Sequence, residues 1–307
     1  MKRSTAGSSR RAASDDCYRL FRTGVALAPV ERDFVKVFGR DAVDYLQGQC
    51  SQDVAALAIG ASAEALLLEP QGRVDAFVRV TRTASDELIL DTDAGFGATV
   101  LERLERFKVR VKVEMSLLDW RCKALRGPAT QELGTVPPGV LALPWRWPGI
   151  SGLDLLGEDP EVPPGVVPCD QAGWEACRIE AGVPVMGAEI DSRTIPAEAG
   201  LVDRCVSFTK GCFTGQELVA RLDARGSNVA RRLRGLVLPG DRGARSFEHG
   251  AEIRSSDKVV GRVTSVAWSP GIRATVALCY VHRSVEVGAA VEAAGLSAEV
   301  RELPLVS

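Results

Sequence analysis

The segment from Ser207 to Arg221 reads SFTKGCFTGQELVAR and joins a glycine-containing turn to the start of a helix. Thr214 and Glu217 have the spacing of a capping box, in which the threonine hydroxyl accepts a hydrogen bond from the glutamate amide and the glutamate side chain reaches back. Gly211 and Gly215 permit a tight turn before the helix. We therefore predict a helix that is capped by Thr214.

Capping does not explain Lys210 and Cys212, which lie in the same segment. A thiol just before a helix lies where unpaired amides and the helix dipole stabilise an anion, and Lys210 adds a positive charge two residues away. Lysine is also rare, because the chain has seven lysines and 31 arginines. We predict that Cys212 is a reactive thiol assisted by Lys210. The alternative is that Cys212 is a small buried apolar side chain.

Beyond about residue 229 the chain changes to short strand-like segments separated by Gly, Ser and Asp turns. These segments are LRGLVL (233–238), AEIR (251–254), VVGRVTSVAW (259–268), IRATVALCYV (272–281), AVEAA (290–294) and SAEVREL (297–303). Six short strands without an intervening helix are typical of a small β-barrel. We predict a C-terminal β-barrel domain over residues 229–307.

The segment before it, 21–228, is predicted to be an α+β region with two subdomains. Helix patterns cover 41–48 and 99–107, and strand patterns cover 73–82, 88–90 and 109–113. In the first of these strands, Val74, Ala76, Val78 and Val80 alternate with polar or aromatic residues and so share one face. The order strand, strand, helix, strand favours a ferredoxin-like subdomain.

Nine of the 16 prolines lie between Gly127 and Asp170, where VLALPW (140–145) and ISGLDLLG (150–157) read as a hairpin. In this hairpin Trp145 and Trp147 form either a stacking surface or a strand face that covers the core, and we favour the second. A helix is predicted from Asp170, a suitable N-cap, to Gly182, a suitable C-terminal glycine.

The N-terminal residues 1–20 are predicted to be a disordered tail, because the first 16 are rich in Ser and Arg and lack an apolar segment of signal-peptide length. Asp15 and Asp16 disfavour a mitochondrial transit segment, so a cytoplasmic location is preferred to the mitochondrial matrix. No apolar run is long enough to span a membrane.

Composition narrows the possible partners of this chain of 307 residues. The 38 basic and 40 acidic side chains leave a net charge of −2, so we expect no direct nucleic-acid or membrane binding. The eight cysteines contain no Cys-x-x-Cys pair, which disfavours a structural zinc site or a disulfide framework and favours a reduced compartment. An iron–sulfur cluster site that uses several of the cysteines, with Cys205 and Cys212 among the candidates, is a remaining alternative.

The stretch KGCFTGQELVAR (210–221) resembles the K-G-C-[aromatic]-x-G-Q-E signature of YgfZ-type folate-binding proteins, which are relatives of the T-protein aminomethyltransferase of the glycine cleavage system. Four further stretches carry the same resemblance: DAVDYLQGQCSQDV (41–54), LLLEPQGRVDAFVRVTR (66–82), RIEAGVPVMG (178–187) and TIPAEAGL (194–201). The resemblance implies a ring-like arrangement of three subdomains that holds tetrahydrofolate or a one-carbon derivative. It also implies a role in making or maintaining iron–sulfur clusters in particular enzymes, including enzymes that modify transfer RNA.

The resemblance also assigns individual residues. Glu180 corresponds to the T-protein glutamate that hydrogen-bonds the pterin ring, and the alternative for this carboxylate is an ion pair with an arginine. The other expected cofactor-binding residues in the matched stretches are Arg178, Lys210, Gly211, Gln216 and Arg221. The T-protein's catalytic aspartate aligns with Ala76, and the adjacent Asp75 points to the opposite face of its strand.

We therefore expect a monomeric tetrahydrofolate-binding protein that supports iron–sulfur client or assembly proteins through Cys212. A folate-dependent aminomethyl- or one-carbon transferase is the enzyme alternative, and Ala76 disfavours it. A non-catalytic scaffold is the second alternative. The thiolate chemistry stays open among a mixed disulfide, a persulfide and a cluster ligand.

Overall fold

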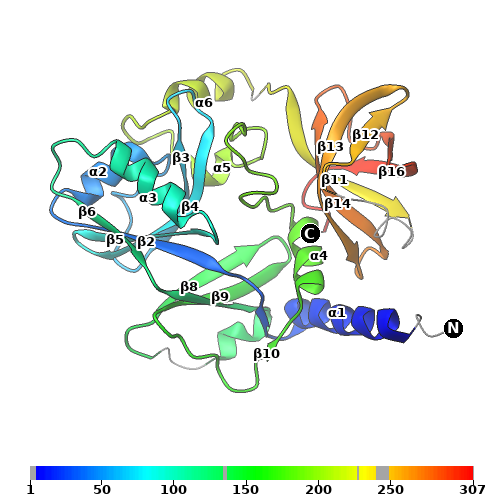
Figure 1. The fold of residues 1–307 in the computed structure, drawn as a ribbon, viewed down its shortest axis with the longest axis horizontal. Coiled ribbons are helices and arrows are strands. Elements are labelled where there is room, and N and C mark those ends of the chain that lie inside the picture. Colours follow the sequence, from blue (N-terminus) through cyan, green and yellow to red (C-terminus); the bar gives the residue numbers. More distant parts are fainter. Residues whose placement is uncertain (1–4, 134–136, 227, 240–248, 307) are drawn as a thin grey trace. The chain divides into compact units, whose positions relative to one another are not determined.

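The computed structural model describes residues 5–133, 137–226, 228–239 and 249–306, and Figure 1 shows its elements. The chain divides into two compact units. The first unit comprises residues 1–30, 122–183 and 233–307, and the second unit comprises residues 31–121 and 184–232. Within the described residues, no helix is both long enough and apolar enough to cross a membrane.

The second unit is built on a five-stranded antiparallel sheet. Its spatial order is β3 (Ser62–Leu68), β4 (Val74–Ala84), β5 (Glu87–Asp93), β2 (Arg32–Phe38) and β6 (Glu114–Leu118). Helices α2 (Ala42–Gln49) and α3 (Gly97–Arg106) follow β2 and β5 in the chain, and α3 packs on β2, β4, β5 and β6. Strands β2, β4, β5 and β6 with these two helices have the ferredoxin-like order, and β3 extends the sheet at its edge. The predicted α+β character is confirmed.

The strand predicted over 109–113 is wrong, because pairing begins only at Glu114, which lies opposite Phe38. Arg110 has a φ of 55°, which interrupts an extended backbone, and the Val109 side chain is exposed. The Lys112 amide donates to the carboxylate of Asp41 at 2.8 Å instead of to a neighbouring strand. The alternation of apolar and basic residues over 109–113 therefore belongs to a connecting segment that pairs with no described strand.

The first unit contains a second five-stranded sheet and two long helices. Its strand order is β10 (Val167–Pro168), β1 (Ala26–Ala28), β7 (Arg121–Arg126), β9 (Ile150–Gly157) and β8 (Leu141–Trp147). The predicted hairpin is confirmed as the antiparallel pair β8–β9, and the short helix η1 (Pro128–Glu132) precedes it. The predicted helix is confirmed as α4 (Gln171–Ala181): Asp170 accepts a bond from the Gly173 amide at 2.9 Å, and Gly182 has a φ of 71°.

The N-terminal segment forms helix α1 (Thr5–Thr23), so a disordered tail over residues 1–20 is wrong for the described part of that range. The helix is ordered by packing that its own composition does not reveal. Phe21 is fully buried, and its ring lies 5.6 Å from that of Trp174 on α4 in an edge-on arrangement. Burying Tyr18 and Phe21 against α4 offsets the entropy of ordering this polar helix.

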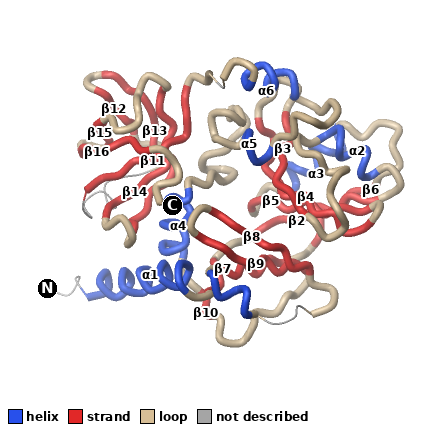
Figure 2. Tube along the Cα trace, turned by 180° about the vertical axis from the view of Figure 1, so that it is seen from behind, coloured by secondary structure: helices blue, strands red, loops and turns tan. Residues whose placement is uncertain are grey.

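The C-terminal residues of the first unit form a closed six-stranded barrel, as predicted from the sequence. Its strands, in the order in which they pair, are β11 (Arg231–Pro239), β14 (Ala274–His282), β13 (Lys258–Ser269), β12 (Glu252–Ser255), β15 (Ala290–Ala293) and β16 (Leu296–Arg301). Figure 2 shows these strands gathered side by side, and their shared core includes Leu236, Ile253, Val263, Cys279 and Val300. The outer side of β13 and β14 packs on α4, so β14 is buried along most of its length.

Candidate functional site

Lys210 anchors the loop that carries the candidate thiol, in the second unit. Its side chain is buried, and its ammonium donates to the carbonyl oxygens of Gln47, Cys50 and Gln52 at 2.5, 2.8 and 2.9 Å. These carbonyls lie at and just beyond the C-terminal end of α2, where unpaired carbonyls and the helix dipole favour a cation. Burial lowers the pKa of Lys210. The lysine thus caps α2 and fixes the loop to it.

Cys212 is exposed, so the alternative of a buried apolar side chain is wrong. The helix that follows, α6 (Gln216–Asp223), begins four residues after Cys212 and has Gly215 as its N-cap. The predicted capping box is also wrong: no side chain caps this helix, and the Gln216 side chain accepts from the Phe213 amide at 3.2 Å. Gly215 has a φ of 81°, and a Cβ there would lie 2.5 Å from the carbonyl oxygen of Glu69.

Two other cysteines near this loop are buried and differ from Cys212. Burial raises the pKa of Cys205 to about 12 and that of Cys50 to about 11. The Ser51 hydroxyl donates to the Cys205 carbonyl at 2.5 Å and accepts from the Leu66 amide at 2.8 Å, which joins the segment before the loop to β3. Among the described residues there is no group of three or more His, Cys, Asp or Glu side chains placed to hold a metal ion.

On β4, Asp75 and Ala76 face opposite sides of the sheet. The Asp75 carboxylate accepts from the Arg103 guanidinium on α3 at 2.9 Å, while Ala76 is fully buried. Arg103 is itself buried and also donates to the Leu68 carbonyl at 2.8 Å and the Gln49 side chain at 3.1 Å. Asp75 is therefore fixed on the helix-covered face.

In the first unit, Glu180 is fully buried on α4 and has three donors within the same unit. The Tyr18 hydroxyl donates to it at 2.9 Å, and Arg22 on α1 and Ser269 on β13 also donate to its carboxylate. Burial, followed by the negative charge of Glu180, raises the pKa of Tyr18. The ion pair with an arginine is therefore the arrangement that the structure shows, and its partner is Arg22.

Arg178 lies one turn of α4 after Glu175 and, like Glu180, is buried and hydrogen-bonded to protein groups. It pairs with Glu175, donates to the Val183 carbonyl at 2.7 Å, and donates to the Ser265 hydroxyl at 2.6 Å. Arg178 and Glu180 therefore lie together in the first unit, both in contact with β13. Lys210, Gly211, Cys212, Gln216 and Arg221 lie together in the second unit.

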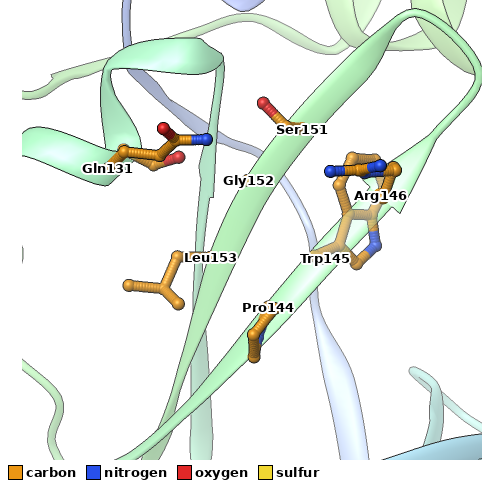
Figure 3. Close-up of a pocket in the computed structure, with 8 residues that line it drawn as sticks. Gln131, Pro144, Trp145, Arg146, Ser151, Gly152 and Leu153 are labelled. Atoms are coloured by element: carbon orange, nitrogen blue, oxygen red, sulfur yellow. The ribbon is translucent and has the colours of Figure 1, made fainter.

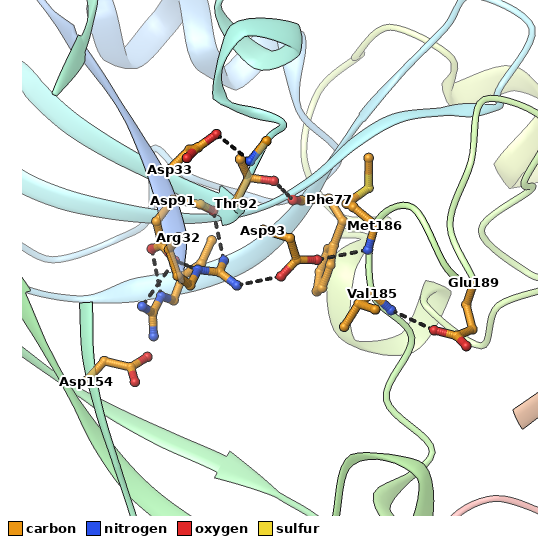
Figure 4. Close-up of polar contacts among 12 residues, drawn as sticks. Arg32, Asp33, Phe77, Asp91, Thr92, Asp93, Asp154, Val185, Met186 and Glu189 are labelled. Carbon is orange, nitrogen blue, oxygen red and sulfur yellow. Dashed lines mark hydrogen bonds and ion pairs between the residues drawn. The ribbon is translucent and has the colours of Figure 1, made fainter. Parts of the chain in front are cut away.

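A buried carboxylate network in the second unit was missed from the sequence (Figure 4). Asp91 is fully buried, accepts from Arg79 at 2.9 Å and forms an ion pair with Arg32 at 2.5 Å. Asp93 pairs with Arg32 at 3.0 Å and accepts from the Met186 amide at 2.9 Å. The signal was available: Asp91 and Asp93 are two residues apart on β5, and so share one face. This network holds the end of the RIEAGVPVMG stretch.

A shallow pocket of about 300 Å³ lies on the hairpin of the first unit (Figure 3). Its lining residues are Thr130, Gln131, Pro144, Trp145, Arg146, Ser151, Gly152 and Leu153, so it contains no predicted site residue. Trp145 and Trp147 pack against Trp174, with ring centroids 5.7 and 4.7 Å away. Both rings are partly buried and pack against the buried cluster, so the prediction that this strand face covers the core is confirmed.

Comparison of the sequence with known proteins assigns the chain to a family. A family model described as the glycine cleavage T-protein C-terminal barrel domain matches residues 231–306. An uncharacterized protein of Haemophilus influenzae is 31% identical over 197 residues, which are 63% of this chain and 67% of that protein. An aminomethyltransferase of Nostoc is 30% identical over 279 residues, which are 79% of this chain and 73% of that protein. The chain belongs to the aminomethyltransferase family.

The family fold is also seen in three dimensions. The crystal structure of glycine cleavage system aminomethyltransferase T from Bartonella henselae is similar with a TM-score of 0.81, covering 95% of this chain and 89% of that one. At 22% sequence identity this similarity shows the fold alone. The resemblance to the T-protein stated from the sequence is therefore confirmed at the level of the family and its fold.

In this member of the aminomethyltransferase family, the contacts of Glu180 and Arg178 determine whether these side chains can bind tetrahydrofolate directly. A pterin bound to Glu180 needs an accessible carboxylate oxygen, and neither side chain offers an exposed polar group in this structure because both are buried and bonded to protein. As direct ligands these two residues do not fit tetrahydrofolate in the arrangement described. Arg221 is exposed on α6 and makes no ion pair with any described residue, so it is available to a carboxylate.

Proposed function

We propose that the protein belongs to the YgfZ-type branch of the aminomethyltransferase family. In this proposal it binds tetrahydrofolate or a one-carbon derivative and supports the assembly or repair of iron–sulfur clusters in a subset of enzymes, including enzymes that modify transfer RNA. Cys212 is the reactive thiol. The partners are iron–sulfur client or assembly proteins, and the protein acts as a monomer in the cytoplasm.

The observation that carries this proposal is the contrast between Cys212 and its surroundings. The thiol is exposed, whereas Lys210 two residues before it is buried and bonded to three carbonyls. Cys50 and Cys205 are buried, and burial raises the pKa of both thiols. A fixed loop that presents one thiol to the outside suits an exchange with another protein, because a partner can reach the sulfur without unfolding the loop.

The enzyme alternative, a folate-dependent aminomethyl- or one-carbon transferase, is favoured by the printed names of relatives such as the Nostoc aminomethyltransferase. The contacts of β4 weigh against it. Ala76 supplies no acid at the position of the T-protein's catalytic aspartate, and Asp75 is bound to Arg103 on the other face. The second alternative, a scaffold without a ligand, is favoured by the internal contacts of Glu180.

Folate binding, in this proposal, uses the exposed end of the matched signature. We propose that the exposed guanidinium of Arg221 binds the carboxylates of a folate tail, with the side-chain NH2 group of Gln216 and the N–H of Gly211 as further donors. Glu180 and Arg178 contribute by fixing α1 and β13 around α4 instead of by direct contact. Binding of tetrahydrofolate is measured by calorimetry with Arg221→Ala and with Arg225→Ala, an exposed arginine just beyond the same helix.

We expect weaker binding for Arg221→Ala, and binding for Arg225→Ala that is close to wild type. Absence of heat with the wild-type protein would favour the scaffold, and equal binding by both variants would remove Arg221 from the site. The transferase alternative is tested separately with an aminomethylated lipoyl carrier protein and tetrahydrofolate. Turnover of that substrate would refute a non-enzymatic role.

The role of Cys212 is tested by complementation in a strain that lacks the gene. The proposal expects lowered activity of iron–sulfur enzymes in that strain and no restoration by Cys212→Ala. The matched control is Cys122→Ala, which removes a partly exposed cysteine of the first unit and is expected to restore activity. Full restoration by Cys212→Ala would refute the assigned role.

A further inference from the structure

Helix α1 and the beginning of α4, both in the first unit, approach each other closely. At Gly173, in the first turn of α4, a Cβ would lie 2.8 Å from the carbonyl oxygen of Ser14 and 3.0 Å from the Cβ of Cys17. Such distances are shorter than normal contacts, so a side chain at Gly173 would separate the two helices. Cys17 therefore faces the start of α4, where the two helices are in close contact.

A second cysteine, Cys169, lies just before the N-cap of α4 and beside Cys17. The Cys17 sulfur accepts from the amide of Asp170, the next residue after Cys169, at 3.4 Å. Cys17 and Cys169 also pack against the same buried cluster of the first unit. Both side chains are partly exposed and both are free thiols, whereas Cys177 in the same cluster is buried. A disulfide requires two free cysteines on chain segments that approach within a few ångströms, and the 3.4 Å contact at the Asp170 amide brings Cys17 to the residue next to Cys169.

We propose that Cys17 and Cys169 form a reversible disulfide that joins α1 to the start of α4. The oxidant is a small disulfide such as oxidised glutathione. The thiolate of Cys17 attacks one sulfur of that disulfide, which forms a mixed disulfide and releases one small thiolate. Cys169 then attacks the Cys17 sulfur and releases the second. Two protein thiols are oxidised, one small disulfide is reduced, and the two protons end on the two small thiols.

The order of the two attacks follows from the surroundings of the thiols. Burial, followed by the neighbouring Cys17 thiol, raises the pKa of Cys169. The Cys17 sulfur lies at the amide of Asp170, the N-cap residue of α4, so we assign the first attack to Cys17 and the second to Cys169.

The bond would act on the residues that surround Glu180. Tyr18 follows Cys17 directly, Arg22 lies one turn after Tyr18 on α1, and both donate to the Glu180 carboxylate. A covalent link at Cys17 therefore restrains the helix that supplies two of the three donors. This inference concerns α1 and α4 alone and holds whether or not the protein binds folate.

The test is disulfide mapping in a Cys212→Ser background, which removes the exposed thiol that would also react. The protein is incubated with oxidised glutathione, its free thiols are blocked, and it is digested without reduction for mass spectrometry. We expect one cross-linked peptide pair containing Cys17 and Cys169, lighter than the two reduced peptides by about 2 Da and separated by dithiothreitol. Cys122→Ser, the matched control, should leave this pair in place.

The outcomes that overturn the proposal are equally defined. Recovery of Cys17 and Cys169 as blocked thiols or as separate glutathione adducts would refute it, and so would a link between either residue and another cysteine. Cys17→Ser and Cys169→Ser should each abolish the cross-link, so a folding defect in one variant leaves the other. In the wild type, oxidation should slow hydrogen exchange of the α1 amides, and dithiothreitol should reverse the effect. Unchanged exchange would contradict the restraint on α1.

Discussion

Replacing Lys210 with methionine tests the anchor of the Cys212 loop. Methionine matches the length of the lysine stem but leaves the carbonyls of Gln47, Cys50 and Gln52 without their shared donor. Each hydrogen bond to a charged group contributes about 1.5–3 kcal/mol, and the desolvation of the ammonium opposes their sum. We expect Lys210→Met to lower the free energy of unfolding by about 2–4 kcal/mol.

The assay is urea unfolding followed by circular dichroism, with Lys258→Met as the control. Lys258 is exposed at the start of β13, and its replacement should change stability by less than about 0.5 kcal/mol. Burial lowers the pKa of Lys210 in the folded protein below its ordinary value of 10.5. At a pH between the lowered pKa and 10.5, the unfolded chain therefore binds more protons at this residue than the folded protein does. The contribution of Lys210 to stability should therefore rise as the pH increases toward 10.5. A Lys210→Met protein as stable as the Lys258→Met control would refute the anchoring role.

Three further substitutions or measurements address the rest of the site. Glu180→Gln keeps the shape of the side chain but leaves the Arg22 guanidinium without its counter-charge, so urea unfolding should show a loss of about 3 kcal/mol. Gly215→Ala should lose about 2–4 kcal/mol, because its Cβ meets a carbonyl and its backbone is left-handed. Gly226→Ala, also left-handed but with open space around it, should lose only about 1 kcal/mol, and equal losses would contradict the close approach at Gly215. With a chromogenic disulfide reagent, Cys212 should react rapidly and Cys205 only after unfolding, and rapid labelling of Cys205 in the native protein would contradict its burial.

The barrel and α4 were predictable because their signals are local. Each barrel strand has its own alternation and its own turn residues, and α4 has Asp170 and Gly182 at its two ends. The strand predicted over 109–113 failed although its alternation was clear, because a strand also needs a partner, and β2 pairs only from Glu114 onward. Helix α1 failed for the opposite reason. Its sequence is polar, and the packing of Phe21 on Trp174 that orders it joins residues far apart in the chain.

The same distinction separates the parts of the candidate site. The exposure of Cys212 could be predicted from a short motif. The partners of the two charged residues lie about 160 residues away in the sequence: Cys50 is a partner of Lys210, and Tyr18 is a partner of Glu180. A charged residue at a buried position of a periodic pattern indicates that it needs a partner, because an unpaired buried charge is unstable. The pattern does not indicate which residue supplies that partner. Asp91 and its arginines were missed for this reason, although the register of β2, β4 and β5 places them side by side.

The contacts change the meaning of the lysine and the cysteine in the K-G-C stretch. From the sequence, Lys210 was expected to act on Cys212 through its charge. In the structure its ammonium is held by the carbonyls at the end of α2, and it holds the loop instead. A buried lysine whose hydrogen bonds go to backbone oxygens can be replaced without changing the chemistry of the thiol, provided that the loop stays in place. If Lys210 acts only by holding the loop, Cys212 in the Lys210→Met protein should be labelled at the wild-type rate once an added osmolyte restores the folded population. If the ammonium instead activates the thiol, the labelling rate should stay low even in the fully folded variant.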